Sequence, residues 1–475
     1  SAQEISRLAE QGCTCSDWSC VEVAEGFDTK TVRATYFSGR VRLGVFRKRV
    51  TFFGGVEKPA GISNATIHNC TIGNDVYIDH VRNYIANYVI EHDVVIQNVN
   101  LLAVEGKSSF GNGTQVAVVN EAGGREIPIY DRLSAQTAYI LAFYRHRPKV
   151  IERLKAMIAG YTASVTSSTG LVAAGARLFN CGIIKNLRIG PATVIEGVNH
   201  LQNGSINSCV EDPVYIGSGV YAKDFIVCSG TKIADGVIIA DCFVGQGAEL
   251  AKQYSAENSV FFANCGGFHG EACAIFAGPY TVTHHKSTLL IAGQFSFLNA
   301  GSGTNQSNHM YKLGPNHQGI VERGSKTASD SYMLWPAKVG PFTVVMGRHY
   351  RNSDISDLPF SYLIEHEDES ILIPGVNLRS VGTVRDARKW PKRDKRKDPN
   401  KLDLINFKLL SPYTIARMLN GSSLLRNLKA TSGENTEYFT YNSVRIPKSS
   451  LEGGIRLHEI GIDKFLGNCL ISRLQ

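Results

Sequence analysis

The chain has 475 residues, of which 43% are hydrophobic, and a formal net charge of +8. This composition allows a large buried core, and the absence of any run of 18 apolar residues argues against a membrane-spanning helix. The positive charge is local, because residues 385–401 carry nine Lys or Arg and three Asp, a net of +6. We interpret 385–401 as a solvated basic linker and expect no nucleic-acid or membrane partner.

Residues 1–30 indicate a short helix and a connector. They lack the basic stretch and apolar core of a signal peptide, so we expect a cytoplasmic protein. The eleven cysteines are odd in number, and Cys209, Cys228 and Cys242 fall within the β pattern, which favours buried free thiols over disulfides. The cysteines at 13–20 lack a second ligand pair for zinc.

Aliphatic residues recur about every six positions in three stretches, and this beat is the main structural signal. Its positions are Ile72, Ile78, Ile85, Ile90 and Ile96, then Ile189 and Ile195, then Ile216, Ala222, Cys228, Ile233, Ile239 and Val244. A short strand buries one inward side chain only when coils stack above and below it, so the beat predicts a parallel β-helix.

The chain divides into four predicted parts. Residues 1–125 form an N-terminal segment and a first β-helix block, and apolar residues at helical spacing predict a helical insertion at 126–167. The β pattern resumes in 168–381 as the main β-helix, with long polar loops and the expected active site. Two amphipathic patterns predict that 382–475 contains the basic linker and a C-terminal α-helical cap over the end of the solenoid.

The beat, with IGNDVYI at 72–78, IGSGV at 216–220 and IADGVIIADCFVGQGA at 233–248, resembles the left-handed β-helix, hexapeptide-repeat transferase superfamily. The chain also looks like a large, elaborated bacterial branch of it. The resemblance implies a three-sided prism of about 18 residues per coil and acyl transfer from coenzyme A or acyl carrier protein. It further implies acyl-CoA as donor, no tightly bound cofactor, and a homo-oligomer, either a trimer or a dimer.

Histidines gather between residues 269 and 349, where six of the thirteen lie. The similar tetrads at 261–264, 275–278 and 290–293 mark one corner of successive coils, so the histidines that follow them should share an edge. An imidazole at this edge suits a general base that takes a proton from a sugar hydroxyl or amine. We predict His285 as this base, with His284 as the second choice.

Two alternatives remain for the same edge. His269, His284 and His285, with Cys265 as a further ligand, would form a metal site in a lyase or hydrolase. The histidines would otherwise only hydrogen bond to corner backbone groups.

A polar stretch follows the histidines, and its GSG turn suits phosphate or sugar binding through backbone N–H groups. Cations downstream suit a diphosphate, and Tyr332 and Trp335 form either a stacking wall or core. The predicted substrate-binding residues are Gly301, Ser302, Gly303, Asn305, Gln306, Asn308, His309, Lys312, His317, Arg323, Lys326, Arg348 and His349.

We therefore expect acyl transfer to a sugar, sugar phosphate or nucleotide sugar, catalysed by a histidine base. A metal-dependent lyase or hydrolase, and a non-catalytic nucleotide-sugar-binding or scaffold protein, are the alternatives. The first 125 residues contain no glycine-rich loop of a nucleotidyltransferase, and the chain has no Walker loop, dinucleotide fingerprint or GxSxG elbow.

Overall fold

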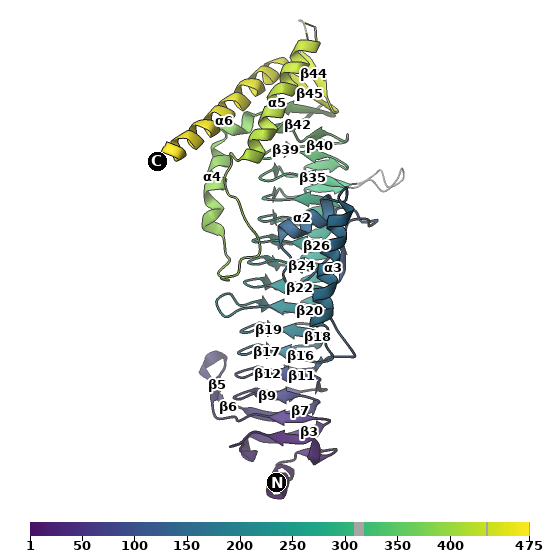
Figure 1. The fold of residues 1–475 in the computed structure, drawn as a ribbon, viewed down its shortest axis with the longest axis vertical. Helices are drawn as coiled ribbons and strands as arrows, with labels where there is room; N and C mark the ends of the chain where they lie inside the picture. Colours follow the sequence, from purple (N-terminus) through teal and green to yellow (C-terminus); the bar gives the residue numbers. More distant parts are fainter. Residues whose placement is uncertain (308–317, 434–435, 475) are drawn as a thin grey trace. The chain divides into compact units, whose positions relative to one another are not determined.

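The computed structural model describes residues 1–307, 318–433 and 436–474. In them the chain is mainly β, and most strand pairs are parallel (Figure 1). The chain forms two compact units. Unit 1 comprises residues 1–115, 127–253 and 396–402, and unit 2 comprises 116–126, 254–395 and 403–475. None of the described helices combines the length and apolar composition that a membrane crossing requires.

The strands of unit 1 stack in three parallel columns, which we call faces 1, 2 and 3. Face 1 contains β3 (Val32–Ser38), β7 (Gly61–His68), β9 (Tyr77–Val81), β12 (Val95–Val99), β17 (Arg177–Phe179), β19 (Val194–Glu196), β21 (Tyr215–Ile216), β23 (Lys232–Ile233) and β25 (Glu249–Ala251). Face 2 contains the end of β7, then β10 (Ile85–Ala86), β13 (Leu101–Ala103), β18 (Ile183–Ile189), β20 (His200–Asn207), β22 (Tyr221–Cys228) and β24 (Ile238–Val244). Face 3 contains β4 (Val41–Leu43), β8 (Thr71–Ile72), β11 (Tyr88–Ile90), β16 (Gly170–Val172) and the second halves of β18, β20, β22 and β24.

The six-residue beat visits these faces in turn. Ile72 lies on face 3, Ile78 on face 1, Ile85 on face 2 and Ile90 on face 3 again. The inward column of face 1 is almost completely buried, at 1% exposure or less: Ile62, Ile78, Ile96, Leu178, Ile195, Ile216, Ile233 and Leu250. Burying such a side chain contributes about 1.5–3 kcal/mol, so the stacked columns form the core of the unit.

Asparagine and aspartate occupy many corners between the faces, where the backbone turns with positive φ. Asn64, Asn98 and Asn180 have φ of 50°, 53° and 54°. These residue types tolerate the left-handed region because their short polar side chains bond locally. The Asn98 amide donates to the Asn180 side chain at 2.8 Å, so the corners also bond between successive coils.

The predicted helical insertion is present in unit 1 between the coils of β13 and β16. It contains α2 (Ala135–Phe143) and α3 (Pro148–Val165), with Pro148 at the start of α3, where a missing N–H costs nothing. Two strands, β14 (Gln115–Ala117) and β15 (Glu126–Pro128), precede the helices. At the N-terminus, a capping box from Ser1 and Glu4 starts α1 (Ala2–Glu10), as the sequence predicted.

Unit 2 also stacks its strands in parallel columns. One contains β27 (Gly266–Phe268), β30 (Val282–Thr283), β33 (Asn299–Ala300), β36 (Lys326–Thr327), β39 (Val344–Met346) and β42 (Tyr362–His366). A second contains β29 (Phe276–Ala277), β32 (Gly293–Phe295), β35 (Gly319–Val321), β38 (Lys338–Val339) and β41 (Asp354–Ile355). The third contains β26 (Ser255–Phe261), β28 (Glu271–Cys273), β31 (Leu289–Ile291), β34 (Asn305–Ser307), β37 (Tyr332–Leu334) and β40 (Arg348–His349).

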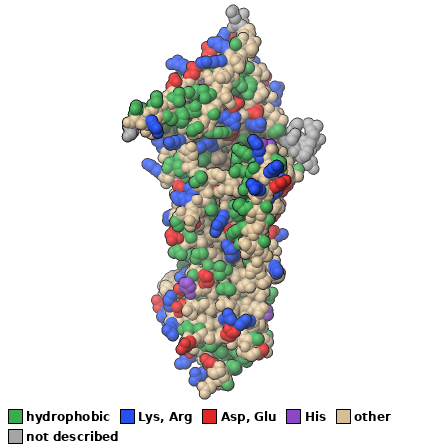
Figure 2. Space-filling model, in the orientation of Figure 1, with side chains coloured by type: hydrophobic (Ala, Val, Ile, Leu, Met, Phe, Trp, Pro, Cys, Tyr) green, Lys and Arg blue, Asp and Glu red, His purple; other side chains and the backbone are tan. Residues whose placement is uncertain are grey.

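The predicted helical cap is confirmed in unit 2. It contains α5 (Pro412–Thr431) and α6 (Lys448–Leu474), next to an antiparallel addition of β43 (Glu369–Ile373), β44 (Tyr438–Tyr441) and β45 (Val444–Pro447). Ile415 and Met418 of α5 pack against the stacked rings of Phe342 and Phe360. Hydrophobic side chains remain exposed on the cap helices (Figure 2), among them Leu466, Leu470 and Ile471 of α6.

The basic segment is more structured than a solvated linker. It begins in α4 (Val381–Lys389), and Arg396 is buried. Within unit 1, residues 397–402 bind three positions one coil apart: Asp212 accepts from the Lys397 N–H, Ser229 donates to Asp398, and Gln246 bonds the backbone of Asn400 and Leu402. The charge count alone did not reveal these backbone bonds.

Candidate active site

The predicted histidine edge forms in unit 2. Gly266 and Gly267 of β27 pair with Val282 and Thr283 of β30, so the residues that follow share a corner. The His284 ring stacks on Phe268 with centroids 5.4 Å apart, and His285 lies 6.4 Å from His284. Both histidines are exposed, and His269 occupies the corner with φ of 59°. In the described part of the chain His285 has no hydrogen bond or ion pair, so no carboxylate orients it.

The alternative metal site gains no support from the described residues. Among them, no group of three or more His, Cys, Asp or Glu side chains is placed to hold a metal ion. Burial raises the pKa of Cys265 to about 12, and its thiol donates to the carbonyl oxygens of Ala277 and Gly278. Cys265 is therefore a protonated core thiol at neutral pH.

The polar stretch after the histidines serves mainly its own structure. Asn308, His309, Lys312 and His317 lie outside the described residues. The turn of Gly301, Ser302 and Gly303 bonds inward, because the Gly301 N–H donates to Thr327 Oγ1 at 3.0 Å. Gln306 is buried and accepts from the Ile291 N–H at 3.1 Å, whereas Asn305 is exposed on β34.

The predicted cations of unit 2 are engaged by the protein itself. Lys326 pairs with Asp386, and Arg348 forms a bidentate pair with Asp330 at 2.8 and 2.9 Å. Arg323 lies over the Phe297 ring and donates to the carbonyl of Asn406.

Two further predicted residues belong to the core of unit 2. Burial lowers the pKa of His349 to about 4, so its ring is neutral, and Nδ1 bonds to Ser370 at 2.8 Å. Trp335 is fully buried and donates to the Ile291 carbonyl, which makes it core. Tyr332 is partly exposed and packs against Tyr350.

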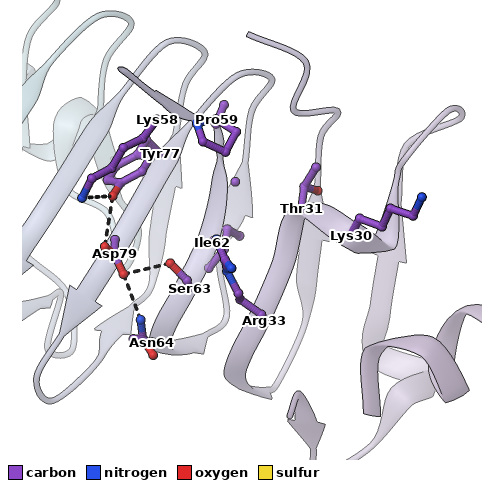
Figure 3. A pocket seen from close by; sticks show the side chains of 12 residues that line it. Lys30, Thr31, Arg33, Lys58, Pro59, Ile62, Ser63, Asn64, Tyr77 and Asp79 are labelled. Atoms are coloured by element: carbon purple, nitrogen blue, oxygen red, sulfur yellow. Dashed lines mark hydrogen bonds between the residues drawn. The ribbon is translucent and has the colours of Figure 1, made fainter. Parts of the chain in front are cut away.

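A different set of residues forms a pocket of about 400 Å³ in unit 1 (Figure 3). The pocket lies at the starts of β3, β7 and β9, beside a hairpin formed by β5 (Arg49–Thr51) and β6 (Glu57–Pro59). Phe52 in the hairpin loop packs edge-on against Tyr77 with centroids 5.0 Å apart. The hairpin thereby holds Lys58 over the pocket.

Asp79 is the only acid that lines this pocket. It pairs in register with Ser63 and stands just before a corner at His80, whose φ is 56°. Its carboxylate accepts hydrogen bonds from Ser63 Oγ at 2.8 Å, Asn64 Nδ2 at 3.0 Å and Tyr77 Oη at 3.0 Å. His80 Nδ1 lies 2.8 Å from the same carboxylate.

These four partners decide the charge of Asp79. Burial opposes ionisation, but the donors outweigh it and lower the pKa of this carboxyl below its usual value. An ionised carboxylate only accepts, so Nδ1 of His80 carries a proton and Nε2 is the free acceptor. Burial and the adjacent Asp79 raise the pKa of Tyr77, which therefore stays a phenol.

Lys58, Tyr77, Asp79 and His80 thus form a continuous polar chain. Lys58 Nζ donates to Tyr77 Oη at 3.2 Å, and Tyr77 donates on to Asp79. His80 is well exposed, with 65% of its side chain accessible, while Asp79 retains only 9%. This arrangement fixes the tautomer and orientation of an exposed imidazole, which is what a general base requires.

The sequence contained this site in plain view, inside the stretch 72–80 that carries the beat. We interpreted Tyr77 and Asp79 only as repeat residues. The available signal was an acid followed by histidine at a corner position. The partners Ser63 and Lys58 come from other parts of the fold, and the strand register brings them together.

The chain matches the family described as "Domain of unknown function (DUF4954)" over residues 1–429. It is similar to an uncharacterized protein of Treponema pallidum (strain Nichols), with 28% identity over 446 residues. The match covers 90% of this chain and 60% of the relative, so the chain spans less than two thirds of that protein's length.

Proposed function

Because this chain belongs to the DUF4954 family, whose description names no reaction, we propose its function from the pocket beside Asp79. We propose that the protein is an acyltransferase of the left-handed hexapeptide-repeat class. It transfers an acyl group from acyl-CoA to a hydroxyl group of a sugar or sugar derivative. Stacked parallel coils with three faces and Asn or Asp at their corners support this assignment.

The contact between Asp79 and His80 carries the proposal. In the sequence His285 was the first choice of base, but an exposed imidazole without a carboxylate partner has no fixed tautomer. His80 has such a partner at 2.8 Å, and the partner also lines the pocket. His80 therefore replaces His285 as the proposed base.

In the proposed reaction, Nε2 of His80 takes the proton of the acceptor hydroxyl as its oxygen attacks the thioester carbonyl carbon. A C–O bond forms, and the tetrahedral intermediate collapses with cleavage of the C–S bond. The imidazolium then returns the proton to the coenzyme A thiolate. Asp79 stabilises the imidazolium between the two steps, so the chain needs no further acid.

The assay measures coenzyme A thiol released from acetyl-CoA in the presence of hexoses and hexose phosphates. His80→Gln should lower turnover by roughly a hundredfold to ten-thousandfold with an unchanged melting temperature. Asp79→Asn should lower turnover as well. Lys223→Ala, an exposed cation on β22 of the same unit, is the control and should retain turnover.

His285→Gln completes the experiment. If this variant loses turnover while His80→Gln retains it, the base lies at the histidine edge and the proposed site is wrong. If neither variant changes turnover, imidazole base catalysis is refuted. Binding of a hexose phosphate without any thiol release would instead favour a non-catalytic binding protein.

A further inference from the structure

Three cations line the Asp79 pocket and have no carboxylate partner among the described residues. They are Lys30, Arg33 and Lys58. Lys58 donates only to the Tyr77 phenol and lies 5.4 Å from the Phe52 ring. Arg33 acts on Tyr77 by its charge, which places the guanidinium in the same part of the pocket.

Neighbouring cations of unit 1 behave differently. Arg40 and Arg42 both pair with Glu22, Lys48 pairs with Asp93, and Arg49 pairs with Glu57. The same coils and hairpin therefore supply carboxylates to their surface cations. At the pocket they do not, and Asp79 is already committed to four donors.

The net side-chain charge of the pocket is +2, from three cations and one carboxylate. We propose that the ligand of this pocket is a phosphomonoester of monosaccharide size, whose dianionic phosphate binds between Lys58 and Arg33. A phosphomonoester carries a charge of about −1.5 to −2 at neutral pH, which complements this pocket. The inference deepens the proposed function, because it names the acceptor as a sugar phosphate.

The shape of the pocket also selects the ligand. Figure 3 shows Lys58 beside Tyr77, Arg33 in the middle, and Lys30 directed away at the opposite end. A single phosphate therefore contacts Lys58 and Arg33, and Lys30 acts from a greater distance. The volume of about 400 Å³ lies near the lower end of the roughly 300–1,000 Å³ typical of ligand pockets, so it suits a sugar phosphate better than a whole nucleotide sugar.

Isothermal titration calorimetry with the full chain tests this inference, with inorganic phosphate, glucose 6-phosphate, glucose and UDP-glucose as probes. Glucose 6-phosphate should bind more tightly than phosphate, and glucose should not bind measurably. Arg33→Gln and Lys58→Gln should each weaken glucose 6-phosphate binding by about tenfold or more, since each removes a hydrogen bond to a charged group. Lys30→Gln should weaken it by only about twofold to threefold, because screened charges act weakly at a distance.

Lys223→Ala should bind like the unaltered protein. Binding should also weaken from pH 7.5 to pH 5.5, because the phosphate gains a proton near pH 6. Equal affinity in all variants, tighter binding of UDP-glucose than of glucose 6-phosphate, or no binding of any phosphate would each overturn the inference. The titration requires no acyl donor, so its failure is distinguishable from the failure of acyl transfer: a ligand that binds without turnover refutes only the reaction.

Discussion

Replacement of Asp131 by asparagine should detach the helical insertion from the coils of unit 1. The Asp131 carboxylate is buried, with 6% of its side chain exposed. It accepts from Tyr161 of α3 at 2.7 Å, from Arg188 and Asn207 of the coils at 3.0 Å each, and from Asn112 at 3.4 Å. One carboxylate therefore joins α3 to β18 and β20.

An asparagine of the same size cannot accept all of these bonds, because one of its two acceptor atoms becomes a donor. Hydrogen bonds to charged groups contribute about 1.5–3 kcal/mol each, and the Arg188 contribution is smaller because that side chain is one third exposed. We expect the docking of α3 to weaken by about 2–4 kcal/mol. Amide protons of α3 should then exchange roughly 30-fold to 1,000-fold faster if opening of the insertion limits exchange.

Hydrogen exchange followed by mass spectrometry measures this change in α3 and, as an internal reference, in β20 and β22. Asp224→Asn is the matched control, because Asp224 stands at a corner of the same unit and accepts only one bond from Asn203 that a neutral side chain can keep. It should leave α3 unchanged. Equal α3 exchange in Asp131→Asn and the unaltered protein would refute the anchoring role, and faster exchange everywhere would show a global effect.

Three further predictions concern stability. Burial holds the pKa of His349 at about 4, below the ordinary value of 6.5, so the unfolded state binds more protons and stability falls as the pH drops from about 6.5 to about 4. His349→Gln should therefore lose less melting temperature than the unaltered protein between pH 7 and pH 4.5, and an equal loss would contradict a buried neutral ring. Gly204→Ala should cost about 1–3 kcal/mol, because its Cβ would lie 2.5 Å from the Phe225 ring, whereas Gly160→Ala in α3 meets no atom within 4 Å and should raise the melting temperature or leave it unchanged. Arg417 of α5 pairs with the buried Glu322, whose pKa burial raises, so Arg417→Met should lower the melting temperature more at pH 8, where Glu322 is charged, than at pH 5. Arg426→Met removes only an exposed pair with Glu459, and if it is as harmful as Arg417→Met, the cap does not depend on the buried pair.

The architecture of the coils could be predicted because its cause is local and repeated. The positions Ile72, Ile78, Ile85 and Ile90 occur at the interval that returns each inward side chain to the next face, and the strands follow it. The helices of the insertion and the cap were also visible, because their apolar spacing has a different period. The strap at 396–402 was missed, because its bonds are made by backbone groups that composition does not report.

The candidate site shows the opposite case. The corner at 269–285 was placed correctly by the repeated tetrads, but the sequence could not reveal that His285 lacks an orienting carboxylate. Arg323, Lys326 and Arg348 looked like free cations and proved to be engaged by Asn406, Asp386 and Asp330. Whether a charge serves a ligand or the protein depends on neighbours that are distant in sequence.

The sequence by itself determined that this chain stacks short parallel strands, where it interrupts them with helices, and that it ends in a helical cap. These features follow from the periods of buried side chains, which neighbouring residues along the chain define. Only the tertiary structure decided that Asp79 gathers Ser63, Asn64, Tyr77 and His80 while Arg33 and Lys58 stay unpaired. That site arises from the register between coils, and register depends on which residues meet in space.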